Sequence, residues 1–109
     1  MPSTLHDSNT AAAPAINTVL AVITAPPPGV YRVKAILSLT GTTETQLQNL
    51  RLRSNAVAVG DVLPTLSAKD LELEWDAVVV PAGNIDLQVV ASATAGSVYN
   101  TQLFAYQVA

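Results

Sequence analysis

A strict alternation of apolar and polar side chains over residues 30–40 is the feature that most limits how this chain can fold. The apolar positions of one parity are Tyr31, Val33, Ala35, Leu37 and Leu39. The other parity holds Arg32, Lys34 and Ser38, with Ile36 as its apolar exception. Successive side chains of a strand point to opposite faces of a sheet, so this pattern predicts an antiparallel strand with one buried face.

The same alternation returns over residues 70–80. Leu71, Leu73 and Trp75 are predicted to point inward, with Trp75 as a core residue. The residues predicted to point outward are Asp70, Glu72, Glu74 and Asp76. Further strands are predicted over residues 16–25, 46–53, 56–59, 84–94 and 97–108, at intervals of about ten residues. No segment has helical spacing, so we predict an all-β fold, an antiparallel, jelly-roll-like β-sandwich of seven to eight strands.

The two ends of the chain differ in character. Residues 1–15 are rich in Ser, Thr, Asn, Ala and Pro without any period, which predicts a flexible N-terminal arm before a sandwich domain over residues 16–109. The last predicted strand is apolar on both faces. One face carries Val98, Phe104, Tyr106 and Val108, and the other carries Tyr99, Leu103 and Ala105. We therefore expect this strand to be covered on both sides.

The composition also indicates that part of the protein surface is covered. Only 12% of the 109 residues are charged, against about 25% in an average soluble domain. Part of the surface is therefore expected to be covered by other subunits or by a partner. The net charge of −3 without a basic run argues against nucleic-acid binding. No apolar run approaches the roughly 20 residues of a membrane helix, so we expect no membrane partner and synthesis in the host cytoplasm.

The catalytic residue types are nearly absent. The chain has no cysteine, which excludes disulfides and zinc–thiolate sites, and its one histidine, His6, lies in the predicted arm. We therefore expect no enzyme activity, no cofactor and no metal. Two alternatives remain for the acidic stripe, Asp70, Glu72, Glu74 and Asp76: a carboxylate pair for glycoside hydrolysis, or calcium binding. We interpret this stripe as the solvated face of a sheet.

Two further alternatives concern binding. The aromatic residues Trp75, Tyr31, Tyr99 and Tyr106 are a candidate sugar-stacking platform, but alternation places the first two inward and the last two on opposite faces. The residues predicted to contact partners lie in three places. They are Leu5, Ala11, Ala12 and Ala13 in the arm, Arg51 and Arg53 on one strand, and Tyr99 and Tyr106 on the last strand. The arginine pair is equally well interpreted as an exposed strand face.

Three stretches carry a resemblance to a known kind of protein. They are Pro28-Gly29-Val30-Tyr31-Arg32-Val33, Asn49-Leu50-Arg51-Leu52-Arg53, and Val80-Pro81-Ala82-Gly83 with the later Ala95-Gly96-Ser97-Val98-Tyr99. Over about residues 16–109 the chain resembles the small β-sandwich proteins of tailed-bacteriophage virions, of the head decoration (cement) or minor capsid type. The resemblance implies a virion structural protein on the capsid surface that binds the major capsid protein and itself, often as a homotrimer. The alternative is a carbohydrate- or receptor-binding module of a phage fibre or tail.

Overall fold

The chain folds as two four-stranded antiparallel sheets in a computed structural model, which describes residues 4–41, 49–62, 70–90, 93 and 95–109. The strands are β1 (Thr4–Ala12), β2 (Val19–Ile23), β3 (Gly29–Thr40), β4 (Leu50–Ser54), β5 (Val57–Val62), β6 (Asp70–Val80), β7 (Ile85–Val89) and β8 (Val98–Gln107). The predicted all-β sandwich is confirmed. The described part of the chain has no helix long and apolar enough to cross a membrane.

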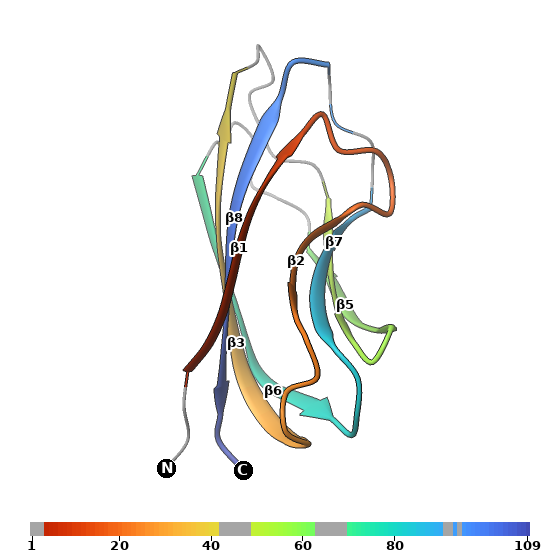
Figure 1. Cartoon of the computed structure of the whole chain (residues 1–109), viewed down its shortest axis with the longest axis vertical. Helices are drawn as coiled ribbons and strands as arrows, with labels where there is room; N and C mark the ends of the chain where they lie inside the picture. Colours follow the sequence, from red (N-terminus) through yellow and green to blue (C-terminus); the bar gives the residue numbers. More distant parts are fainter. Residues whose placement is uncertain (1–3, 42–48, 63–69, 91–92, 94) are drawn as a thin grey trace.

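The two sheets face each other across a shared core (Figure 1). The first sheet has the order β1-β8-β3-β6, and the second has the order β2-β7-β4-β5. Strands β6 and β5 therefore form the edges on one side of the sandwich, and β1 and β2 form the edges on the other side. The β6–β7 turn lies at the lower end of Figure 1, and the start of β8 lies at the upper end.

The alternation over residues 30–40 is confirmed in full. The inward set on β3 is buried, with exposed fractions between 0% and 3%, and comprises Tyr31, Val33, Ala35, Leu37 and Leu39. Ile36 lies on the opposite face and is 37% exposed. The facing sheet contributes fully buried side chains at Leu52, Ile85 and Leu87, so both sheets fill one core.

Strand β6 follows the predicted alternation but lies at an edge. Leu71, Leu73 and Trp75 pack against the core while remaining half-buried, because no further strand covers them on that side. The prediction that Trp75 points inward is confirmed, although its side chain is only partly covered. A register shift opposite Tyr31 and Val33 puts two consecutive exposed residues in β6, after which Val78 and Val80 are buried.

The N-terminal segment is not a flexible arm, and this prediction was wrong. Thr4–Ala12 forms β1, which pairs with β8 along its whole length, from Thr4 opposite Tyr106 to Ala12 opposite Val98. Leu5 and Ala11 pack against the core, and the Asp7 carboxylate accepts a hydrogen bond from the Val22 amide at 2.9 Å. The edge of β8 supplies backbone partners that do not depend on side-chain hydrophobicity, so a polar segment can form a strand there.

The other predicted strands are present with shifted ends. The segment predicted at 16–25 narrows to β2, and the segment predicted at 84–94 narrows to β7, with Ile85, Leu87 and Val89 inward as expected. Ala91, predicted to point inward, lies outside the described residues, as do residues 46–48 of another predicted strand. Residues 24–28 connect β2 to β3 as a turn, in which the Tyr31 hydroxyl donates a hydrogen bond to the Pro27 carbonyl.

Candidate functional site

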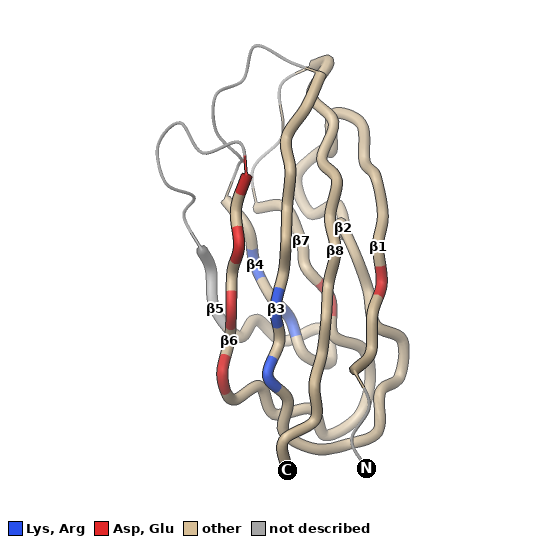
Figure 2. Tube along the Cα trace, turned by 90° about the vertical axis from the view of Figure 1, so that its left-hand side faces the viewer, with Lys and Arg blue, Asp and Glu red and all other residues tan. Residues whose placement is uncertain are grey.

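The outer face of the first sheet, meaning the face turned away from the second sheet, carries its ion pairs between the edge strand β6 and its neighbour β3, where the charged residues of both strands lie side by side (Figure 2). Figure 2 also shows Asp7 on β1, whose carboxylate accepts a hydrogen bond from the Val22 amide of the second sheet. The acidic stripe of β6 is exposed, as predicted for a solvated face. Arg32 and Lys34 on neighbouring β3 form ion pairs with this stripe. Arg32 Nε lies 3.6 Å from Glu74 Oε1, and Lys34 Nζ lies 2.9 Å from Glu72 Oε1. The hydrogen bond with Glu72 raises the pKa of Lys34. The two signs therefore neutralise each other locally, with little effect on stability because both partners are exposed.

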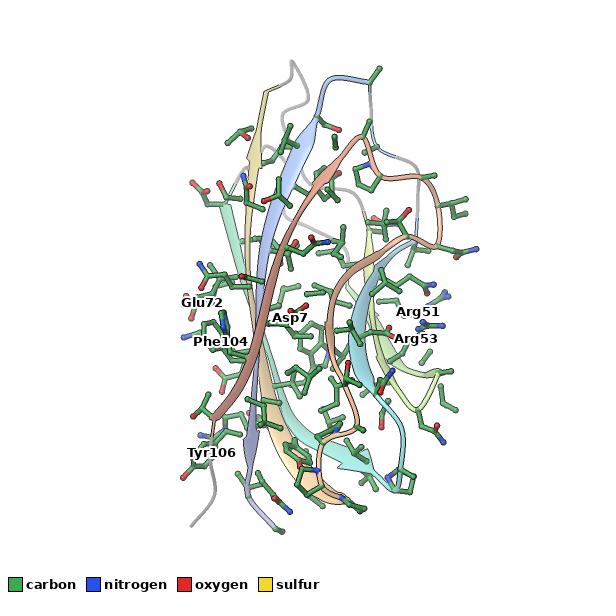
Figure 3. The ribbon with its side chains drawn as sticks, viewed as in Figure 1. Asp7, Arg51, Arg53, Glu72, Phe104 and Tyr106 are labelled. Atoms are coloured by element: carbon green, nitrogen blue, oxygen red, sulfur yellow. The ribbon has the colours of Figure 1, made fainter. Side chains whose placement is uncertain are left out.

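An aromatic strip lies beside this charged edge, along the second half of β8. Phe104 and Tyr106 point away from the second sheet (Figure 3), and Tyr106 is 44% exposed. The His6 ring from β1 contacts the Phe104 ring, with 4.6 Å between centroids and a tilt of 30°. Ile36 from β3 completes the strip, which lines a shallow depression of about 320 Å³.

The other half of the outer face is a neutral depression, which we call the polar trough. Its volume is about 670 Å³, and its polar lining residues are His6, Ser8, Asn9, Thr10, Ser38, Asn100, Thr101 and Gln102. The Thr10 hydroxyl donates to Asn100 Oδ1 at 3.0 Å, and Asn100 Nδ2 donates to Thr40 Oγ1 at 3.5 Å. Strands β1, β8 and β3 are thus joined across the trough by side chains as well as by their backbones.

A second exposed surface lies where the β4–β5 hairpin meets the β6–β7 turn. Val57, Val59 and Val79 are 66%, 42% and 65% exposed, and with Pro81 they line a depression of about 360 Å³. We call these four residues the valine patch. The Ser54 hydroxyl donates to the Val79 carbonyl at 2.7 Å, which ties β6 to the hairpin. In the sequence, the run of three valines at 78–80 could have indicated this patch, because side chains alternate along a strand and the middle valine, Val79, then points outward.

The geometry around the valine patch depends on two turns that touch. Asn55 has a φ of 52°, and its amide donates to the Asn84 carbonyl at 2.8 Å. Gly83 has a φ of 97°, and a Cβ added there would lie 2.4 Å from Asn55 Oδ1. The backbone conformation therefore favours glycine at this position, and a larger residue would also displace the Asn55 side chain.

Arg51 and Arg53 lie on the second sheet, away from the outer face of the first (Figure 3). Arg53 donates to both carboxylate oxygens of Asp86 at 2.8 Å, and the Asp86 side chain is only 9% exposed. This hydrogen-bonded pair raises the pKa of Arg53. Asp86 therefore occupies Nε and Nη2 of Arg53, and the partner contact predicted for this arginine stays a prediction. Arg51 is half-buried on the same strand.

The remaining residues predicted to contact partners do not gather in one place. Tyr99 is fully buried, so its predicted partner contact is wrong and it belongs to the core. Leu5 and Ala11 are half-buried against the core, so only part of each side chain is exposed. Ala12 and Ala13 are exposed at the end of β1. Tyr106 alone falls within a candidate surface, the aromatic strip.

No group of three or more His, Cys, Asp or Glu side chains able to hold a metal ion occurs in the ranges that the structure describes. His6, the one histidine, lies on β1 against Phe104. Thr101, whose hydroxyl lies inside the sandwich, has no hydrogen-bond partner for Oγ1 among the described residues.

Comparison with known proteins identifies the fold. No protein-family model matches the sequence, and no curated protein matches it. Among solved structures, the chain is similar to the CBM36-1 domain of a multidomain xylanase from the hindgut metagenome of Trinervitermes trinervoides, with a TM-score of 0.58 and 9% identity over 100% of this chain and 98% of that one. It is also similar to the PRD1 vertex protein P5, with a TM-score of 0.55 and 13% identity over 96% and 97% of the two chains.

A third similar structure is the asymmetric unit of the human norovirus GI.7 Houston strain virus-like particle in T=3 symmetry. Its TM-score is 0.50 at 8% identity, over 99% of this chain and 30% of that one. Two of these three neighbours are therefore virus proteins, and one is a domain of a multidomain xylanase. At such identities the likeness establishes the β-sandwich fold.

Proposed function

We propose that this protein is a virion structural protein without enzyme activity, which decorates or cements a phage-type capsid by binding the major capsid protein lattice and other copies of itself. The observation that carries the proposal is the valine patch. Its three valines are between 42% and 66% exposed and come together from strands β5 and β6. Clustered exposed aliphatic side chains are typical of surfaces that another protein covers.

The strength expected of this contact explains why the protein would act in several copies. Burying the exposed parts of three valines stabilises a complex by about 3 kcal/mol, taking roughly 1.5 kcal/mol for a whole valine side chain. This is less than the approximately 4 kcal/mol of a millimolar complex, so one patch alone binds weakly. A homotrimer on a repeating lattice presents three patches at once, and the combined attachment becomes strong through avidity.

Two further properties support a virion role. Charged residues make up only 12% of the chain, which fits a protein that is partly covered in an assembly. The likeness to the PRD1 vertex protein P5 extends over 96% of this chain and 97% of that one, so the entire sandwich has a counterpart there.

The test is co-sedimentation with undecorated particles assembled from a phage major capsid protein. We expect the parent protein to sediment with the particles, and we expect Val57→Ser and Val79→Ser to sediment at least several-fold less. Val108→Ser is the matched control, because Val108 is 47% exposed but lies outside the valine patch. Equal sedimentation of all three variants would contradict the proposed docking surface.

Light scattering of the free protein at micromolar concentration tests self-association. We expect the molar mass of a trimer. If the mass is that of a monomer at all concentrations, trimers can form only on the capsid lattice. Failure of the parent protein to bind particles at all would favour the alternative role as a carbohydrate- or receptor-binding module of a fibre or tail.

A further inference from the structure

We propose that the polar trough on the outer face of the first sheet binds a short neutral oligosaccharide. This goes beyond capsid attachment and does not depend on it, because the two surfaces belong to different parts of the molecule. The trough is formed by β1, β8 and β3, whereas the valine patch is formed by the β4–β5 hairpin and the β6–β7 turn. A protein attached by the valine patch can therefore keep the trough accessible.

The chemistry of the trough matches that of sugars. Its hydroxyl groups come from Ser8, Thr10 and Ser38, and its side-chain amides come from Asn100 and Gln102. Hydroxyls and amides each donate and accept hydrogen bonds, as the hydroxyls of a saccharide do, so the two sets can pair in several geometries. Among the described residues that line this depression, none is Asp, Glu, Lys or Arg. The lining therefore offers no opposite charge to pair with a charged ligand, and a neutral ligand needs none.

Asn100 is the best-positioned of these groups. It lies on β8, which has a strand on either side, and hydrogen bonds to Thr10 and Thr40 hold its amide in one orientation. Each bond uses one site, and a primary amide has two donor hydrogens and two acceptor lone pairs. One hydrogen and one lone pair therefore remain for a ligand. Side chains fixed on strands bind at a lower entropic cost than side chains on loops.

One end of the trough adds an apolar surface. The ring of His6, which contacts Phe104, and the partly exposed side chain of Ile36 both border the depression. An aromatic ring beside polar groups suits a sugar ring, which has an apolar C–H face and a polar rim. The volume of about 670 Å³ falls within the roughly 300–1,000 Å³ of small-molecule sites, which is room for a short oligosaccharide.

A protein partner fits this half of the sheet less well. The centre of a protein interface is usually apolar with a polar rim. Here the exposed apolar side chains lie at one end, and hydroxyls and amides occupy the middle. The aromatic strip next to the trough is flanked by Arg32 and Lys34, but both are in ion pairs with β6, which leaves little attraction for an acidic ligand.

The test is isothermal calorimetry with neutral tri- to hexasaccharides of glucose, galactose, mannose, rhamnose, xylose and N-acetylglucosamine, with sialylated oligosaccharides as the acidic comparison. We expect at least one neutral series to bind with a Kd of about 0.1–1 mM, as for a shallow site with few hydrogen bonds. Gln102→Ala and Asn100→Ala should each weaken binding about five- to tenfold, the effect of one neutral hydrogen bond with its contacts. Thr24→Ala, an exposed change between β2 and β3, is the control and should bind as the parent does.

Three outcomes overturn the proposal: no neutral oligosaccharide binds at about 10 mM, far above the expected Kd; the acidic series binds better; or Gln102→Ala binds as the parent does. Gln102 is exposed on β8, so its truncation is expected to leave the fold intact, which circular dichroism checks for both variants. Val57→Ser should bind sugar normally, and Gln102→Ala should sediment normally with capsids. The two proposals therefore fail separately.

Discussion

Asp7 holds the N-terminal strand to the opposite sheet, and its replacement by alanine tests whether β1 is part of the folded domain. The carboxylate on β1 accepts the Val22 amide of β2 at 2.9 Å, across the side of the sandwich where both sheets end. Asp7→Ala removes this bond and leaves a half-buried N–H without its acceptor. Asp7→Asn keeps an oxygen at the same position and is the matched control.

The expected cost follows from the type of bond. A hydrogen bond to a charged group contributes about 1.5–3 kcal/mol, and the half-buried position of Asp7 favours the lower part, about 1.5–2 kcal/mol. One kcal/mol lowers the melting temperature of a domain near this size by roughly 4–8 °C, so Asp7→Ala should melt about 6–16 °C below the parent. Asp7→Asn should lose less than half as much, since its neutral oxygen accepts a weaker bond.

Two measurements check this expectation. Differential scanning calorimetry gives the melting temperatures of the three proteins. Amide hydrogen exchange reports Val22 directly, and its protection should fall in Asp7→Ala while amides of β3 keep theirs. A melting temperature within about 1 °C of the parent, well below the shift expected for such a bond, together with unchanged Val22 exchange, would refute the reasoning. In that case β1 would contribute little to the stability of the fold.

Three other changes have definite expected results. Arg53→Met should destabilise the protein by about 2–3 kcal/mol in a denaturant titration, because it leaves the Asp86 carboxylate without its partner; the cost is below that of a fully buried pair because Arg53 is 24% exposed. Adding Asp86→Leu should restore most of the lost stability, and no recovery would contradict this explanation. Thr101→Val should raise stability by up to about 1 kcal/mol in the same assay, because the hydroxyl is buried without a partner among the described residues; a loss of stability would reveal a bond to it. Because Glu72 raises the pKa of Lys34, this pair should contribute below the ordinary lysine pKa, as long as the Glu72 carboxylate is ionised, and be lost as pH rises through the raised value. NMR titration in Glu72→Gln should return the pKa of Lys34 toward normal, and an unchanged value would exclude the pair as the cause.

The sequence predicted best those strands that have one buried and one solvated face. On β3, the inward and outward sets differ clearly in polarity, so alternation alone identified both the strand and its core residues. On β6, the same signal identified the inward set but not its exposure, since strand order decides whether Trp75 lies at an edge. Strand order is a property of long-range pairing, which local periodicity does not contain.

The prediction failed where a strand owes its existence to a neighbour. Six of the nine residues of β1 are polar, and Leu5 and Ala11 are its contacts to the core. Its backbone partners come from β8, about 90 residues later in the chain, and nothing within residues 4–12 indicates that pairing. The polar trough was missed for the same reason. Ser8, Ser38 and Asn100 are far apart in sequence and become neighbours only through the order of the first sheet.

The central position of β8 also determines when this chain can fold. β1 and β3 both pair with β8 and not with each other, so the first sheet is completed only when residues 98–107 become available. Folds dominated by such distant pairings form slowly, on the scale of milliseconds to seconds. During synthesis on the ribosome, a chain halted before Val98 has unpaired strand edges at β1 and β3, which can pair with other nascent chains. Interrupted translation is therefore the step at which this protein is most exposed to aggregation.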